Sequence, residues 1–181
     1  TETPVRDEKG NVIAALGMSI QLIFLLMVAM LGLLVGTVSL VARAYGGGDT
    51  QRLNHLLVQS TQLPAIVGVI VGIGGALSAE YLLLLFGASQ TVAGIGAEYL
   101  SVMMLGTPFF YITLLYAGIL RGVGNTRLPF MVALVTNVIN AVLNYGLILG
   151  NLGMPALGVT GSALGTVIAQ ATGVIALVWI L

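Results

Sequence analysis

The sequence predicts an all-α polytopic membrane protein with five transmembrane helices. Of its 181 residues, 58% are hydrophobic and 7% are charged, whereas a soluble domain carries about 25% charged residues. Six basic and six acidic side chains are too few to cover a water-facing surface of this size. Uncharged stretches of the length that crosses a bilayer, about 20 residues, recur along the chain. Because hydrocarbon offers no water to exposed backbone groups, each such stretch is expected to be a helix.

The first two spans are predicted near 13–41 and 53–78. No charged residue occurs between Gly10 and Ala42. The second span opens with a polar patch at 59–62, which we interpret as a hydrated helix entry, with a cavity lining as the alternative. Between the two spans, Gly46, Gly47 and Gly48 permit positive backbone dihedrals and predict a tight turn.

The remaining spans are predicted near 97–120, 128–149 and 160–181. After Arg127 no charge occurs, but 54 residues are too many for one helix. The turn residues of 150–158 therefore separate spans four and five. The apolar segment 81–86 is too short to cross a bilayer, so it is expected to lie at the interface or to extend span two.

Glycines spaced four residues apart recur in four segments, and small residues at this spacing let membrane helices approach closely. The pairs are Gly32 and Gly36, Gly68 and Gly72, Gly118 and Gly122, and Gly161 and Gly165. Their recurrence predicts tight packing within one helix bundle.

The basic residues predict the orientation of the chain. Arg43 and Arg52 lie in one loop, and Arg121 and Arg127 lie in another on the same side. The opposite side has only Arg6 and Lys9. Because basic loops stay in the cytoplasm, we expect 43–52 and 121–127 inside and the start of the chain outside. The chain ends within an apolar stretch, so we expect it to be a piece of a longer protein that does not transport alone.

Several functional classes are disfavoured by what the sequence contains. It has no cysteine and a single histidine, His55, which argues against disulfides and thiolate or histidine metal sites. Nucleic acid is not an expected partner, because no basic run occurs. No Ser/His pair, metal-ligand cluster or carboxylate pair falls within a predicted span. We therefore expect no enzyme activity and no cofactor, and the lipid bilayer as the main partner.

Polar residues recur on one face of each of the last two spans, where burial is costly and often functional. Their three- and four-residue spacing places each set on one helix face. The sets are Asn137, Asn140 and Asn144, and Ser162, Thr166 and Gln170. Counted inward from the connecting loop, Asn144 and Thr166 lie roughly 9 Å deep. Asn140 and Gln170 lie a turn deeper, so the two sets are expected to meet at matching heights.

These groups have two interpretations. They can bond across helices and hold the bundle together, at about 0.6 kcal/mol each. They can also line a cavity that binds a cation or relays a proton, with help from a carboxylate. No such carboxylate lies well inside a span, since Glu80 and Glu98 fall at outer ends. Tyr111 belongs to an aromatic group whose usual place is the core or the lipid face; we retain it, with Gln170 and Asn137, as a candidate substrate-cavity residue.

Three segments carry a family resemblance. GTVSLVARAYGGGD at 36–49 is similar to the end of the second helix of multidrug and toxic compound extrusion (MATE) transporters. RGVGNTRLP at 121–129 resembles that family's loop between helices four and five. The segments 140–150 and 155–166 resemble its helices five and six, in the same order.

The resemblance implies that the five spans are helices two to six of an amino-terminal six-helix lobe. The family fold has twelve helices in two such lobes around a central cavity. Its members export amphipathic, often cationic compounds, driven by inward sodium or proton flow, here across a bacterial inner membrane. The expected partners are then these compounds, the family's first helix and the carboxy-terminal lobe.

The resemblance also implies a coupling-cation site. Asn140 and Asn144 match the family's fifth-helix site positions, and the sixth-helix hydroxyl matches Thr166 or Ser162. Some branches have Asp at the position of Asn144, so the sequence leaves sodium and proton coupling open. The family's first-helix Asp would precede Thr1. Two other functions stay open: a lipid-linked saccharide flippase of the same superfamily, disfavoured because no Lys or Arg lies inside a span, and a non-transporting membrane module.

Overall fold

A computed structural model describes residues 4–180, and within that range the chain is helical apart from turns. The helices are α1 (Pro4–Gly46), α2 (Thr50–Leu77), α3 (Ala79–Leu85), α4 (Gln90–Leu105), α5 (Thr107–Gly122), α6 (Arg127–Leu149) and α7 (Gly158–Ile180). Four of them, α1, α2, α6 and α7, are long and apolar enough to cross a membrane, and α4 with α5 supplies a fifth if that bent pair is one span. The predicted fold class is confirmed.

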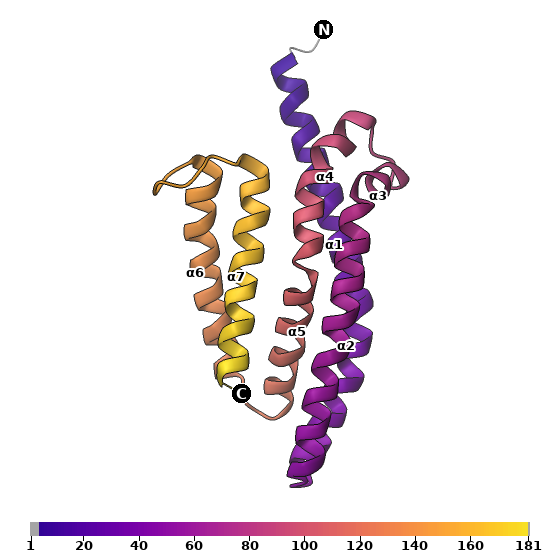
Figure 1. Ribbon diagram of the computed structural model, residues 1–181, viewed down its shortest axis with the longest axis vertical. Helices are drawn as coiled ribbons and strands as arrows, with labels where there is room; N and C mark the ends of the chain where they lie inside the picture. Colours follow the sequence, from indigo (N-terminus) through magenta and orange to yellow (C-terminus); the bar gives the residue numbers. More distant parts are fainter. Residues whose placement is uncertain (1–3, 181) are drawn as a thin grey trace.

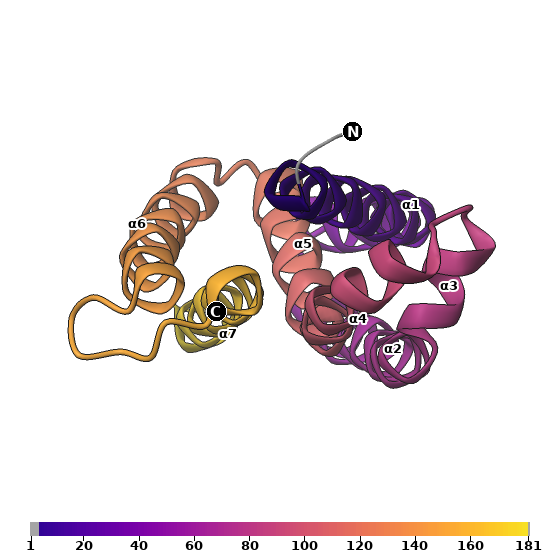
Figure 2. The same ribbon diagram turned by 90° about the horizontal axis from the view of Figure 1, so that it is seen from above.

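The helices form two groups that lie side by side (Figure 1). One contains α1, α2, α4 and α5, with the short α3 at its upper end. The other is the antiparallel pair α6 and α7, in which α7 lies between α6 and the first group (Figure 2). The two groups meet where α7 packs against α4 and α5.

The third span differs from its prediction. The sequence predicted one helix over 97–120, but the helix begins at Gln90 and bends by 47° between α4 and α5. Pro108 has no N–H to donate to the carbonyl of Met104, and the Thr107 hydroxyl donates to that oxygen at 2.5 Å instead. Gly106 allows α7 to pack at the bend, because a Cβ there would lie 2.5 Å from Val167 Cγ2.

Glycine packing is confirmed for three of the four predicted pairs. A Cβ at Gly68 would lie 2.6 Å from Pro108 Cα, and one at Gly72 would lie 2.8 Å from the Met104 carbonyl oxygen. The pair at 118 and 122 approaches Val38, and the pair at 161 and 165 approaches α6. The prediction is wrong for Gly32 and Gly36, where a Cβ would meet nothing within 4 Å among the described residues.

The surface of the bundle is apolar. Large hydrophobic side chains point outward on every long helix, among them Val35, Ile70, Val138 and Trp179. On α2 the outward side chains are mostly polar up to Gln62, with Val58 an exposed exception, and are apolar from Leu63 onward. This pattern suits a bundle surrounded by lipid, with the first turns of α2 at the polar boundary.

Candidate functional site

The α6–α7 pair brings the predicted amides and hydroxyls together. Small residues on one side of α7 allow close approach of the two backbones: a Cβ at Gly161 would lie 2.4 Å from the Leu147 carbonyl oxygen. A Cβ at Gly165 would lie 2.5 Å from Asn144 Oδ1. The glycines therefore leave space that the asparagine side chains fill.

Four residues form a chain of hydrogen bonds across this interface. Thr166 Oγ1 donates to the Ser162 carbonyl at 2.9 Å and accepts from Asn140 Nδ2 at 3.1 Å. Asn144 Nδ2 in turn donates to Asn140 Oδ1 at 3.1 Å. All four residues are partly buried. The two asparagines and Thr166 are thus one connected group, here called the amide cluster.

The amide cluster ends in a free acceptor. Asn144 Oδ1 is buried and has no hydrogen-bond partner within the described range 4–180. A buried carbonyl oxygen without a partner is costly, so it calls for an explanation such as strain, a bound water or ion, or a functional role. Carbonyl and hydroxyl oxygens are ligands that hard cations prefer. The arrangement can accept a cation or the hydrogen of a protonated carboxyl group.

Asn137 lies outside the amide cluster. It is exposed, and its Nδ2 donates to the carbonyl of Ala133 on the same helix at 2.9 Å. Its spacing from Asn140 predicted that the two side chains share one helix face, but the hydrogen bond of Asn137 stays within α6.

The pairing of the two polar faces is shifted from the predicted one. The sequence paired Asn144 with Thr166 and Asn140 with Gln170, whereas Asn140 bonds Thr166. The cause is the close contact of Gly161 with the Leu147 carbonyl. This contact fixes the position of α7 along the axis of α6. The connecting loop, with Gly150, Leu152 and Gly153 at positive φ, does not place both helix ends at one level.

Gln170 faces a different neighbour. It lies one turn after Thr166, on the side of α7 that carries Ala163 and Leu177. These two residues belong to hydrophobic clusters that include residues of α4 and α5. Gln170 Oε1 is buried and has no partner in the described part of the chain. Thr113 Oγ1, on α5, shares this condition. Sequence reasoning missed Thr113 because, within the third span, it considered only the aromatic side chains.

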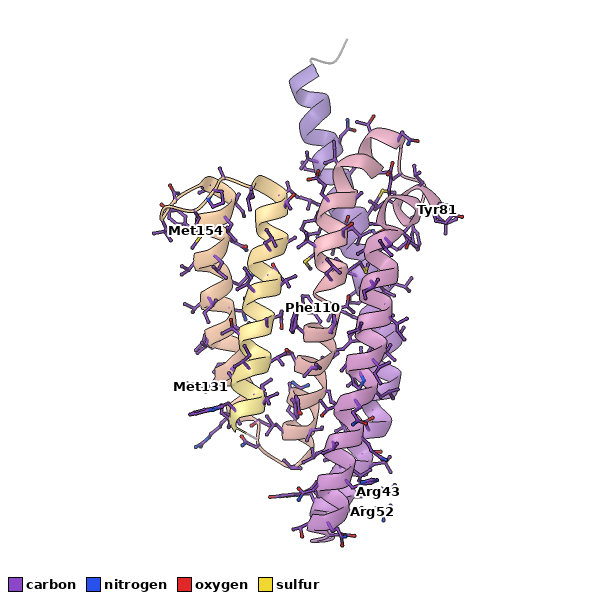
Figure 3. The ribbon with its side chains drawn as sticks, viewed as in Figure 1. Arg43, Arg52, Tyr81, Phe110, Met131 and Met154 are labelled. Carbon is purple, nitrogen blue, oxygen red and sulfur yellow. The ribbon has the colours of Figure 1, made fainter. Side chains whose placement is uncertain are left out.

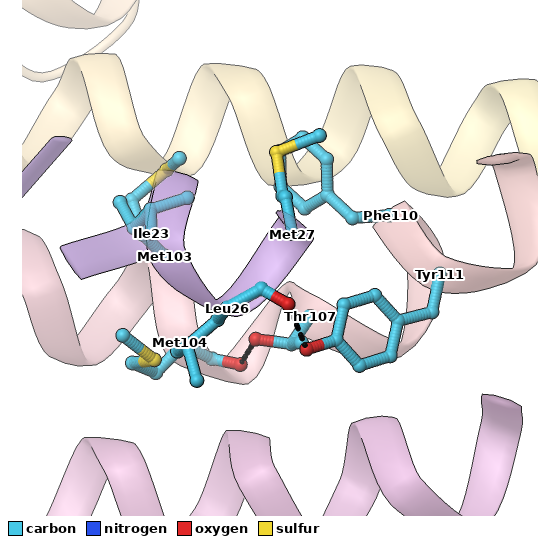
Figure 4. A pocket seen from close by; sticks show the side chains of 8 residues that line it. All are labelled: Ile23, Leu26, Met27, Met103, Met104, Thr107, Phe110 and Tyr111. Carbon is cyan, nitrogen blue, oxygen red and sulfur yellow. Dashed lines mark hydrogen bonds between the residues drawn. The ribbon is translucent and has the colours of Figure 1, made fainter. Parts of the chain in front are cut away.

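Tyr111 connects helices at the bend. Its side chain is buried, and its hydroxyl donates to the Leu26 carbonyl on α1 at 3.3 Å. With Met27, Phe110 and their neighbours it lines a pocket of about 10 Å³, the space of a single water molecule (Figure 4). Tyr111 therefore lies apart from the amide cluster, and its hydroxyl is already bonded.

Among the described residues no acidic group takes part in the amide cluster. Glu98, which the sequence placed at the outer end of a span, lies instead in the middle of α4, because that helix begins at Gln90; it is exposed and accepts a hydrogen bond from Thr160 Oγ1 on α7 at 3.3 Å. The side chains that the structure describes include no group of three His, Cys, Asp or Glu that could hold a metal ion. A cation in the amide cluster would thus be bound by neutral oxygens of this chain.

Comparison with known proteins agrees with this architecture. The MatE family model matches residues 10–146. The chain belongs to the MATE family. It is 32% identical over 158 residues to the Bacillus subtilis (strain 168) protein named "Probable multidrug resistance protein YoeA", a match that covers 87% of this chain and 34% of that protein.

Solved MATE structures have the same fold. An inward-facing multidrug resistance MATE transporter matches with a TM-score of 0.83 and 25% identity, over 94% of this chain and 38% of its own. An outward-facing one matches with a TM-score of 0.82 and 27% identity, over 93% and 37%. The chain therefore spans about a third of the length of the MATE proteins it matches.

Proposed function

We propose that this chain forms part of a cation-coupled antiporter that exports amphipathic, often cationic compounds across a bacterial inner membrane. The observation that carries the proposal is the buried, unpartnered Oδ1 of Asn144 at the end of the amide cluster. The similarity to a protein named for multidrug resistance and to a solved multidrug resistance MATE transporter supports export as the task.

The coupling ion would be bound by Asn144 Oδ1 with oxygens of Asn140 and Thr166. An amide offers a carbonyl oxygen without a buried charge, which suits sodium. An amide does not titrate at physiological pH, so a proton-driven cycle requires a carboxyl group from outside this chain. In that case the family's first-helix Asp would carry the proton, and the amide cluster would tune its pKa by hydrogen bonding.

The substrate would bind nearby, in a cavity completed by the first helix and the carboxy-terminal lobe of the whole protein. Of the three predicted cavity residues, Gln170 has the strongest support, because its buried oxygen is free. Thr113 on α5 joins it for the same reason. Asn137 and Tyr111 stay predictions.

Two rival functions make different demands on the structure. A flippase for lipid-linked saccharides needs cationic groups for the pyrophosphate inside the membrane. Here Arg43, Arg52, Arg121 and Arg127 lie in the first or last turns of their helices. A non-transporting membrane module would use the amide cluster for packing alone, and catalysis has no supporting group of residues.

The test is ion-gradient-driven export by the full-length protein in proteoliposomes. We expect Asn140→Ala/Asn144→Ala to abolish coupled export while membrane insertion and the size-exclusion profile stay normal. Asn137→Ala, one turn nearer the predicted cytoplasmic side, is the matched control and should retain most of the flux. Normal flux in the double variant would leave only the packing role.

A further inference from the structure

The closed end of the α1–α2 hairpin holds two arginines at one height. Arg43 lies in the last turn of α1, and Arg52 lies in the first turn of α2. They are four residues before Gly47 and four residues after Gly48, which form the turn. Figure 3 shows both side chains close together near the lower end of the hairpin. Antiparallel helices place residues equally far from the turn beside each other.

Neither guanidinium is neutralised by the part of the chain that the structure describes. In the described residues, neither has an ion pair or a side-chain hydrogen bond. Asp49 is the carboxylate nearby, and its Oδ1 caps α2 by accepting from the backbone N–H of Arg52 at 2.9 Å. Two positive charges and one negative charge leave this end of the hairpin with a net positive charge, and the arginines repel each other.

The two arginines border a hollow with both polar and apolar walls. Its volume is about 400 Å³, and its lining is Leu40, Arg43, Ala44, Gly47, Asp49 and Arg52. Leu40 is 47% exposed although it is a large hydrophobic residue. A ligand that suits this lining has an anionic head that contacts the guanidinium groups and an apolar part that lies beside Leu40.

Phosphate is the anion that fits best. A guanidinium binds phosphate oxygens through two parallel N–H bonds, so two guanidinium groups can hold one phosphate from two sides. The hollow lies just beyond residue 41, where the first predicted span ends, and the ends of membrane spans lie near the level of the lipid headgroups. The cytoplasmic leaflet carries the anionic lipids, and arginines near it gain favourable energy from its surface potential.

We propose that Arg43 and Arg52 bind the phosphate of an anionic phospholipid of the cytoplasmic leaflet, with its glycerol and upper acyl chain beside Leu40. The proposal uses the predicted cytoplasmic placement of the hairpin and is independent of the coupling ion and the substrate. The bound lipid would relieve the repulsion between the arginines and hold this end of the hairpin at the membrane surface.

The experiment measures lipid binding to the purified full-length protein by native mass spectrometry. Phosphatidylglycerol and phosphatidylcholine with the same acyl chains are titrated separately, and glycerol 3-phosphate serves as the soluble phosphate. We expect Arg43→Gln/Arg52→Gln to weaken phosphatidylglycerol binding by about tenfold or more. Phosphatidylcholine binding should not change, and glycerol 3-phosphate should not compete at equal concentration.

The control is Arg121→Gln/Arg127→Gln, which removes the other predicted cytoplasmic arginine pair and the same total charge. It should retain the affinity for phosphatidylglycerol. Equal losses in both double variants would show a general surface charge effect and overturn the site, as would unchanged binding in Arg43→Gln/Arg52→Gln or competition by glycerol 3-phosphate. If the Gln variant does not fold, Arg43→Lys/Arg52→Lys replaces it; that variant keeps the charge, loses the paired N–H geometry, and should bind more weakly than the wild type.

Discussion

At the scale of single residues, the carboxamide of Asn144 fits between α6 and α7 because residue 165 is glycine. A Cβ at this position would lie 2.5 Å from Asn144 Oδ1 and 3.4 Å from the Asn144 backbone nitrogen. The backbone cannot move without separating the helices, so the carboxamide would have to rotate. Its hydrogen bond to Asn140 would then be lost.

We therefore predict that Gly165→Ala impairs coupling without unfolding the protein. Displacing Asn144 should weaken the binding of the coupling ion by about tenfold, the loss typical when a neighbour of a metal ligand is disturbed. The measurement is the ion concentration that gives half-maximal export in proteoliposomes. Gly173→Ala is the matched control on the same side of α7, because its Cβ would press only on the Thr136 hydroxyl, at 2.9 Å. An unchanged ion dependence in Gly165→Ala would contradict the proposed ligand role of Asn144.

The members of the amide cluster could be predicted from sequence, but their pairing could not. The spacing of Asn140 and Asn144 fixes a shared helix face, whatever surrounds the helix. Which residue of α7 they meet depends on where Gly161 contacts α6. Counting residues from the loop does not predict that axial position. The free oxygens of Asn144 and Gln170 depend on the same packing.

At the scale of helices, α2 packs against the bend between α4 and α5. Gly68 lies on Pro108, and Gly72 lies on the carbonyl of Met104, whose usual helical donor four residues later is replaced by the proline. The bend and the glycines are thus complementary. A straight helix that faced larger side chains on α2 could not pack this closely against it. The sequence predicted close packing from the glycines, yet it did not predict the bend, because counting uncharged residues is insensitive to one proline.

We predict that Gly68→Ala destabilises the bundle. Its Cβ would lie 2.6 Å from Pro108 Cα, a backbone atom that can move only if α5 shifts, and such overpacking costs about 1–3 kcal/mol. The measurement is the thermal unfolding midpoint of the full-length protein in detergent. Gly74→Ala, in the same helix, is the comparison, since its Cβ would meet nothing within 4 Å among described residues. Equal midpoints for the two variants would refute the packing argument.

At the scale of the whole molecule, the orientation in the membrane is a prediction that rests on four arginines. The turn at 47–48 and the loop near Asn125 lie at one end of the bundle, and the loop near Asn151 lies at the other (Figure 1). Single cysteines at Gly47, Asn125 and Asn151, in a full-length protein without other cysteines, test it directly. An impermeant maleimide applied to intact cells should label position 151 alone. Labelling at 47 and 125 but not at 151 would show that the chain has the opposite orientation.

The similarity to two transporter states leads to a prediction about motion. The chain matches an inward-facing structure with a TM-score of 0.83 and an outward-facing one with 0.82. If one arrangement of helices fits both states, these helices move together as a unit, and alternating access comes from their motion against the rest of the transporter.

Spin labels on the exposed positions Ile70 of α2 and Val138 of α6 measure this within the full-length protein. Their distance should change by no more than about 2 Å between ion-free and ion-saturated conditions, the size of ordinary helix shifts. A second pair, from Val138 to a site outside this chain, should change by more and shows that the protein has switched state. A large change between 70 and 138 would mean that the α6–α7 pair moves against α1, α2, α4 and α5. The amide cluster, which lies entirely within that pair, would then move with it as the transporter opens and closes.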